Sequence, residues 1–324
     1  MTMIKIKFPE RDRAIETWYK DKVNSVLAND KHDSAQKTEK KKSTKYKKNI
    51  KELELLLKKY GIPYSFEQIL TLKYHELKDI KEKIKDDSNF RTKIDKLKNG
   101  KNSKNNFLID AYKELRKKYG KELIEKTGVT VCPYCNRNFV NNGKDRAMAQ
   151  FDHFFDKKTF PLFAISLYNL IPCCSSCNHT KQSESISFSP YDYDFRTDDM
   201  LTFNYCLKDG NKYRIEIDTN ENINDCNGKE RKNPIISNID VLQLREQYNL
   251  HTDLLKQIIF KTCKMPESYL QEIREMLKTT IDLDLGMTEE EIYYDNYLSE
   301  EKYHLRPLSK FTHDMVIRVK DDAK

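Results

Sequence analysis

Two Cys-x-x-Cys pairs in the middle of the chain constrain its fold more than any other feature. Cys132 and Cys135 form the first pair, and Cys174 and Cys177 form the second, which begins 39 residues after Cys135. Four thiolates from two such pairs complete a closed tetrahedral Zn²⁺ site, and the intervening chain is long enough for a hairpin and a loop. Cys173 is a further neighbour, but only Cys174 stands at a two-residue gap from Cys177. The spacing therefore predicts a structural zinc site.

The alternative for the first pair is a redox dithiol. A dithiol of that kind begins a helix that follows a strand, near the start of a βαβ unit. Here 131 residues of mostly helical pattern precede Cys132, and no parallel-sheet pattern follows it. A thiol oxidoreductase would be free of zinc and would have a reactive Cys132, whereas the duplicated pair favours zinc.

Composition favours helices and argues against a membrane protein. Only 8 Gly and 9 Pro occur in 324 residues, which is too few for a turn-rich sandwich or barrel. The N-terminus is charged from Lys5 onward and has no apolar segment of signal-peptide length. The most apolar stretch, residues 160–174, is interrupted by Pro161 and Pro172 and is too short to span a bilayer. We expect a soluble, cytoplasmic protein, whose cysteines bind metal or catalyse rather than form disulfides.

The pattern of apolar residues predicts an α+β protein that is mainly helical. We expect a basic helical domain at residues 1–128, a core containing the four cysteines at 129–200, a β-hairpin and loop at 201–235, and a C-terminal helical domain at 236–324. The last domain either docks a partner protein or packs on the core.

Positive charge is concentrated at the N-terminal end. Residues 1–125 contain 33 Lys and Arg against 20 Asp and Glu, a net charge of +13, whereas the remainder has 26 against 31, or −5. A basic surface attracts phosphate backbones whatever their sequence. The chain is therefore expected to bind nucleic acid through the lysines of one basic run: Lys41, Lys42, Lys45, Lys47 and Lys48. The alternative is that they form a solvated helix face.

The segment between the cysteine pairs contains Asp152-His153 and then Asn169-Leu170, and the second cysteine pair is followed by Asn178 and Lys181. With these residues at this spacing, the segment resembles the HNH endonuclease family. In that family Asp-His ends a strand, Asn-Leu lies in a loop, and Cys-x-x-Cys-His/Asn-x-x-Lys opens a helix. The resemblance implies an embedded ββα-metal finger held by the four-cysteine zinc site. Asn178 replaces the final histidine, so the chain is similar to an HNN version of the family.

A closer likeness is to HNH nucleases of bacterial anti-phage systems of the Septu type. The shared runs are CPYCNR at 132–137, FDHFFDK at 151–157 and RPLSK at 306–310. This resemblance implies an effector nuclease of phage defence that has an ATPase partner chain. The sequence contains no phosphate-binding loop for ATP, so any ATP-driven control would have to come from that partner. DNA is the expected substrate, ahead of RNA.

Each residue of the motif suits phosphodiester hydrolysis. A neutral imidazole can take a proton from water, so His153 is the expected general base. Oxygen donors suit Mg²⁺ or Mn²⁺, and Asp152 and Asn178 would supply them. The resemblance gives Asn169 another role, in which its amide bridges backbone groups of the loop and holds the His153 ring. Lys181 would contact a phosphate of the nucleic acid or cap its helix.

Two alternatives remain within this interpretation. His179 could replace Asn178 as the metal ligand, although the spacing puts it one residue too late. The whole segment could also be a non-catalytic zinc module that binds nucleic acid or protein. In that case the cysteines would matter, and Asp152, His153 and Asn178 could be replaced freely.

Overall fold

The computed structural model divides the chain into two compact units. It describes residues 4–7, 12–28, 36–98, 103–144, 147–208, 212–264, 268–269, 271–272, 275 and 288–323. Unit 1 contains Met1–Lys5, Thr130–Phe139 and Ile186–Lys324, and unit 2 contains Ile6–Val129 and Val140–Ser185. Helices and small antiparallel sheets are mixed, as expected of an α+β protein.

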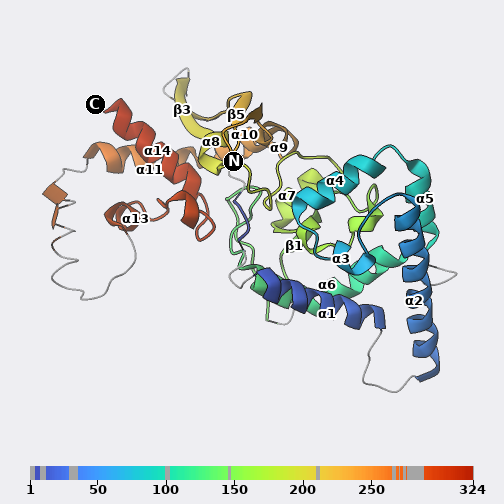
Figure 1. The fold of residues 1–324 in the computed structure, drawn as a ribbon. Coiled ribbons are helices and arrows are strands. Elements are labelled where there is room, and N and C mark those ends of the chain that lie inside the picture. The colour runs from blue at the N-terminus through green and yellow to red at the C-terminus, as the bar shows by residue number, and fades with distance from the viewer. Residues whose placement is uncertain are drawn as a thin grey trace. The chain divides into compact units, whose positions relative to one another are not determined.

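Unit 2 contains the N-terminal helices and one short hairpin (Figure 1). Its elements are α1 Asp12–Ala28, α2 Gln36–Lys59, α3 Phe66–Ile69, α4 Tyr74–Ile84, α5 Ser88–Lys96, α6 Phe107–Thr127, β1 Gln150–His153, η1 Pro161–Phe163, η2 Leu167–Asn169, β2 Leu170–Cys173 and α7 Ser175–Lys181. Helix α6 begins where the Asn106 side chain accepts from two backbone N–H groups. It ends at Gly128, whose left-handed conformation (φ 64°) a residue with a Cβ seldom adopts.

The hairpin of unit 2 is covered by helices. β1 and β2 pair antiparallel, and α7 packs against β1. Helix α6 packs against α1 and η1, and the Tyr112 hydroxyl of α6 donates to the carbonyl oxygen of Phe151 at 3.3 Å. The Tyr19 hydroxyl of α1 donates to the carbonyl oxygen of Ile165 at 3.0 Å. The N-terminal helices and the hairpin therefore share one core.

Unit 1 contains the C-terminal half of the chain together with the first cysteine pair (Figure 1). Its elements are α8 Thr197–Met200, β3 Thr202–Lys208, β4 Lys212–Asp218, β5 Asn222–Asn224, β6 Glu230–Lys232, α9 Ile235–Val241, α10 Leu244–Tyr248, η3 Asn249–His251, α11 Thr252–Lys264, α13 Glu289–Tyr293, η4 Glu300–Lys302 and α14 Ser309–Asp322. Strands β3 and β4 pair along their full length, which confirms the predicted hairpin at 202–218. Helix α14 packs on β3 and α11.

The RPLSK run surrounds one residue of the CPYCNR run inside unit 1. Asn136 is fully buried and has a left-handed backbone (φ 46°), which Asn tolerates better than most residues. Its amide donates to the carbonyl oxygens of Tyr303 (3.1 Å) and Arg306 (3.3 Å). Its side-chain oxygen accepts from the Ser309 hydroxyl (3.3 Å) and the Lys310 backbone N–H (3.2 Å). Two runs about 170 residues apart in sequence therefore form one hydrogen-bonded structure.

This organisation differs from the predicted division into four segments. Residues 6–128 do not form a domain of their own but share unit 2 with the hairpin, and residues 236–324 share unit 1 with Thr130–Phe139. The C-terminal helices thus pack on the first cysteine pair, where the Tyr248 hydroxyl donates to the Cys135 carbonyl oxygen at 2.7 Å. Within the predicted C-terminal helical domain, the apolar periodicity of residues 267–281 indicates a helix, but these residues lie largely outside the described ones. Across the part of the chain that the structure describes, no helix is both long and apolar enough to cross a membrane.

Unit 1 offers a stability test at Lys310, which is buried between two carboxylates. Its Nζ lies 2.7 Å from Oδ1 of Asp198 and 2.7 Å from Oδ1 of Asp314. We expect Lys310→Ala to lower the free energy of unfolding by about 3–5 kcal/mol, because the buried Asp314 and the partly exposed Asp198 lose their counter-charge. Urea titration followed by circular dichroism measures this.

The matched control is Arg318→Ala on the same helix. Arg318 makes an exposed ion pair with Asp322 at 3.1 Å, and such pairs contribute about 0–1 kcal/mol. If both variants lowered the free energy of unfolding equally, the buried Lys310 ion pairs would stabilise unit 1 no more than the exposed pair does.

Candidate functional site

The predicted site residues between the cysteine pairs and on the helix after them lie on β1, η2 and α7, all within unit 2. Asp152 and His153 end β1, and Asn169 immediately precedes β2. In the antiparallel register Asp152 pairs with Ile171, and His153 pairs with Leu170. Asn178 follows on α7, which packs against β1. The strands β1 and β2 and the helix α7 thus follow one another along the chain.

Asn169 fixes the loop between the two strands. Its side-chain oxygen accepts from the Phe155 backbone N–H at 2.7 Å, and its amide donates to the carbonyl oxygens of Phe155 (3.1 Å) and Phe163 (3.0 Å). These bonds bridge backbone groups of the loop. Asn169 makes no bond to the His153 ring in these contacts. It acts on the ring indirectly, because it binds the carbonyl of Phe163, and the carbonyl of the next residue, Ala164, contacts the ring.

His153 has one nitrogen fixed by the backbone and one that can accept a proton. Its Nε2 lies 3.0 Å from the carbonyl oxygen of Ala164. Since a carbonyl oxygen can only accept, Nε2 carries the hydrogen and Nδ1 keeps its lone pair. Burial, and next the charge of Lys157, hold the His153 pKa well below its usual range. The imidazole is therefore neutral near pH 7, as a general base requires.

Aromatic and cationic groups surround the same ring. Tyr112 of α6 meets it edge to face, with ring centroids 4.4 Å apart. The Nζ of Lys157 lies 3.4 Å from Nδ1 of His153. Sequence analysis did not select Lys157 or Tyr112. The signal for Lys157 was present, because it ends the FDHFFDK run four residues after His153, whereas nothing in the sequence links Tyr112 to the ring.

Asp152 forms a buried ion pair with Lys181. The Nζ of Lys181 lies 3.1 Å from Oδ2 and 3.3 Å from Oδ1 of Asp152, and it also donates to the carbonyl oxygen of His153 at 3.2 Å. Lys181 is 0% exposed and Asp152 4%. The prediction that Lys181 contacts nucleic acid is therefore wrong for this structure, because α7 turns its side chain inward against β1.

Asn178 also faces β1, where its amide donates to the side-chain oxygen of Gln150. His179, one residue later, is exposed. Both residues line an open depression in unit 2 with Gln150, Ser175, Ser176 and Gln182. The helix register thus distinguishes the two candidates, since Asn178 contacts the strand that ends in Asp152-His153.

The predicted Mg²⁺ or Mn²⁺ ligands do not fit a divalent cation in this arrangement. Carboxylate and amide oxygens are the right donor class. However, both oxygens of Asp152 face the Lys181 ammonium, whereas Asn178 bonds to Gln150 only through its amide nitrogen. The cation beside Asp152 is the ammonium of the chain itself.

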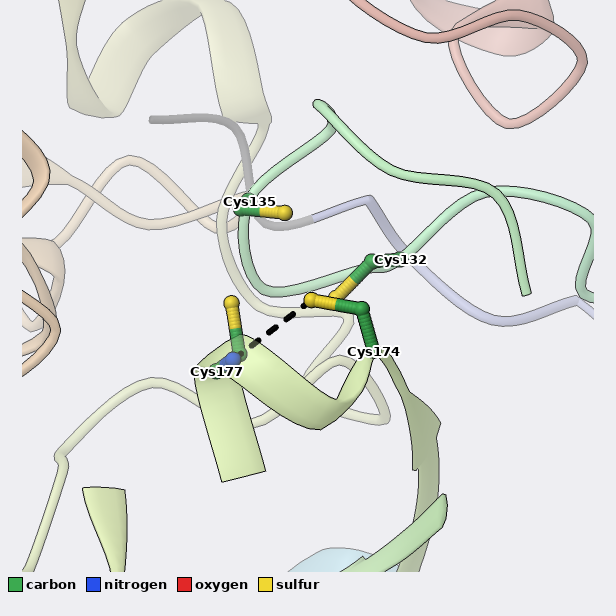
Figure 2. Close-up of side chains that lie close together, drawn as sticks. All are labelled: Cys132, Cys135, Cys174 and Cys177. Atoms are coloured by element: carbon green, nitrogen blue, oxygen red, sulfur yellow. Dashed lines mark hydrogen bonds between the residues drawn. The ribbon is translucent and has the colours of Figure 1, made fainter. Parts of the chain in front are cut away.

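The four predicted zinc ligands form a cluster. Cys132, Cys135, Cys174 and Cys177 are buried free thiols, and their Sγ atoms all lie within 4.8 Å of one another. Figure 2 shows the four side chains converging. Sulfurs bound about 2.3 Å from one tetrahedral ion lie roughly 3.8 Å apart, so the spacing suits a metal ion such as zinc.

Backbone N–H groups support thiolate character within each pair. The Cys177 N–H donates to Sγ of Cys174 at 3.5 Å, where Cys174 is the N-cap of α7 (Figure 2). The Arg137 N–H donates to Sγ of Cys135 at 3.4 Å. Cys173 lies outside the cluster, and burial raises the pKa of its thiol well above the usual value. A protonated thiol is a poor ligand, which agrees with the choice of Cys174.

The basic run of α2 is only partly described. Lys47 and Lys48 are exposed, and Lys48 lies 3.7 Å from Glu52. The side chains of Lys41, Lys42 and Lys45 lie outside the described residues. Nucleic-acid binding by these lysines stays a prediction.

Comparison with known proteins finds no relative. No protein-family model, no curated protein and no solved structure matches the chain. Function must therefore be argued from the residues and their geometry.

The cysteine cluster gives the first prediction for this site. Purified protein should contain about one tightly bound Zn²⁺ per chain, and replacing any of the four cysteines by Ser should make it insoluble or protease-sensitive. Metal analysis by mass spectrometry, with Cys173→Ser as the control that keeps its zinc, checks this. Folded protein without zinc would contradict it.

The second prediction concerns the buried ion pair. Lys181→Met leaves the Asp152 carboxylate buried without a counter-charge, so the free energy of unfolding should fall by about 3–5 kcal/mol. Adding Asp152→Asn to that variant should recover part of the loss. Chemical denaturation measures both, with exposed Lys158→Met as the control. A Lys181→Met protein as stable as wild type would mean that the pair does not form.

Proposed function

We propose that this protein is a nuclease of the HNH type that hydrolyses phosphodiester bonds in nucleic acid, with DNA as the first candidate substrate. The observation that supports this best is the state of His153. Its Nε2 is bound to the Ala164 carbonyl at 3.0 Å, its ring is neutral, and its Nδ1 is the nitrogen that can accept a proton. The residue lies at the end of β1, beside the other residues of the motif.

In the proposed reaction Nδ1 of His153 takes a proton from water. The water oxygen forms a bond to phosphorus as the bond from phosphorus to the leaving oxygen breaks. The leaving oxygen keeps the electron pair of that bond and takes a proton from solvent water. The Ala164 carbonyl keeps the ring in one tautomer and stabilises the imidazolium that forms. Asn169 holds the loop that carries this carbonyl through its bond to Phe163.

The proposed function involves two kinds of metal ion, a structural zinc and a catalytic divalent cation. The cysteine cluster would hold zinc as a structural ion, because a short hairpin cannot bury a core of its own. A catalytic divalent cation at Asp152 would first have to replace the Lys181 ammonium, and none of the steps above depends on it. The anti-phage role and the ATPase partner belong to the same proposal and rest on the sequence resemblance.

A second candidate function is a non-catalytic zinc module that binds nucleic acid or protein. The Asp152–Lys181 ion pair favours it, because a carboxylate neutralised in the interior performs a structural role. The two functions differ in what they require of His153.

The test is cleavage of plasmid, single-stranded DNA and total RNA, with and without Mg²⁺ or Mn²⁺. We expect the wild type to cleave at least one of them and His153→Ala to be about a hundred- to ten-thousand-fold slower, which is the usual contribution of a general base. Circular dichroism and nucleic-acid binding should show that the variant is folded and still binds.

His179→Ala is the matched control, since its imidazole is exposed on α7. It should cleave at close to the wild-type rate. Cleavage by folded His153→Ala at the wild-type rate would exclude the nuclease mechanism and favour the zinc module.

A further inference from the structure

Lys157 is placed directly at the proton-accepting nitrogen of His153. Its Nζ lies 3.4 Å from Nδ1 and 5.0 Å above the ring of Tyr112. The side chain is half-buried, and burial is the main cause that lowers its pKa. The ammonium therefore lies in a partly dry position, where a negative charge would stabilise it.

A second cation lies close to this position. Arg116 is exposed on α6, one turn after Tyr112. Its charge lowers the pKa of His153 and of Lys157, after the larger effect of burial on each, so the guanidinium acts on both groups. Arg116 thus follows by one helical turn the tyrosine whose ring contacts both His153 and the Lys157 ammonium, and two cations near a neutral imidazole attract an anion.

The nearby carboxylates are engaged elsewhere. Asp156 uses Oδ2 to accept from the backbone N–H groups of Lys158 (3.1 Å) and Thr159 (2.9 Å). Asp152 is paired with Lys181. Among the described residues, no ion pair joins either Lys157 or Arg116 to a carboxylate. The Asp156 and Asp152 charges raise the pKa of Lys157, against the larger effect of burial, but neither carboxylate makes a direct ion pair with Lys157 within the described part of the chain.

We propose that Lys157 and Arg116 bind the scissile phosphate of the nucleic acid and hold it beside Nδ1 of His153. This rests on the proposed nuclease function and adds the groups that bind its substrate. Lysine binds a phosphate as a point charge, and arginine can bind two of its oxygens at once. On binding, the Lys157 ammonium would exchange its contact with Nδ1 for a phosphate oxygen, which leaves the Nδ1 lone pair free for water.

Equilibrium binding tests the phosphate contact without cleavage. In a His153→Ala background, we compare Lys157→Gln and Arg116→Gln with the exposed neighbours Lys158→Gln and Lys117→Gln. The probe is a fluorescein-labelled DNA, single-stranded and duplex, titrated at several salt concentrations. We expect Lys157→Gln and Arg116→Gln each to weaken binding. Each should also reduce the salt slope, which is the slope of the logarithm of the binding constant against the logarithm of the salt concentration, by about one, the effect of losing one phosphate contact. The controls should change the slope by clearly less.

Cleavage kinetics with intact His153 separate positioning from folding. Lys157→Gln should lower kcat/KM by about ten- to a hundred-fold, and Lys157→Arg should restore part of the loss because it restores the charge. A merely structural role would give no recovery with Arg and no change in salt slope.

The possible failures are distinguishable. If the wild type cleaves DNA or RNA while Lys157→Gln and Arg116→Gln keep wild-type kinetics and salt slopes, the inference is overturned and the nuclease function stands. If the wild type cleaves nothing, the proposed function fails. In that case the salt slopes of Lys157→Gln and Arg116→Gln test the phosphate contacts without cleavage. A reduced slope supports contacts between these residues and phosphate, and an unchanged slope overturns them.

Discussion

The β1–β2 hairpin is too small to be stable alone, and this constraint governs unit 2. Each strand has four residues, and an isolated two-stranded hairpin is marginal in water. Its residues are nevertheless almost all buried, because α6 and α7 pack close by and Tyr112 bonds to the backbone of β1. The helices that the sequence assigned to a separate basic domain therefore provide the cover that the hairpin needs.

The sequence predicted well the features that depend on short-range pattern or spacing. The cysteine cluster follows from two Cys-x-x-Cys pairs, and the β3–β4 hairpin lies in the segment predicted to contain one, residues 201–235. Features that depend on long-range packing were not predictable. No local pattern shows that RPLSK surrounds Asn136, and this contact is one reason that residues 236–324 are not a separate domain.

Lys181 shows the limit in physical terms. Its position one turn after Asn178 was readable from helical spacing, but a lysine is usually solvated, so a phosphate contact was the natural expectation. Burial of this lysine depends on a carboxylate in the neighbouring strand, since an unpaired ammonium would be too costly to bury. Asp152 supplies that carboxylate. The sequence prediction assigned Asp152 to a metal ion and therefore did not consider it as the partner of Lys181.

Lys181 contacts Asp152, and Lys157 contacts His153. The Asp156 and Asp152 charges raise the pKa of Lys157, against the larger effect of burial. The charges of Lys157, Lys181 and Arg116 each lower the pKa of His153, after the larger effect of burial. An incoming phosphodiester would act in the opposite direction, because its negative charge would offset the charges of Lys157 and Arg116 and favour the imidazolium at the moment when Nδ1 accepts a proton. In this arrangement the substrate itself would raise the basicity of the imidazole that deprotonates the attacking water, and the free protein would keep that imidazole neutral.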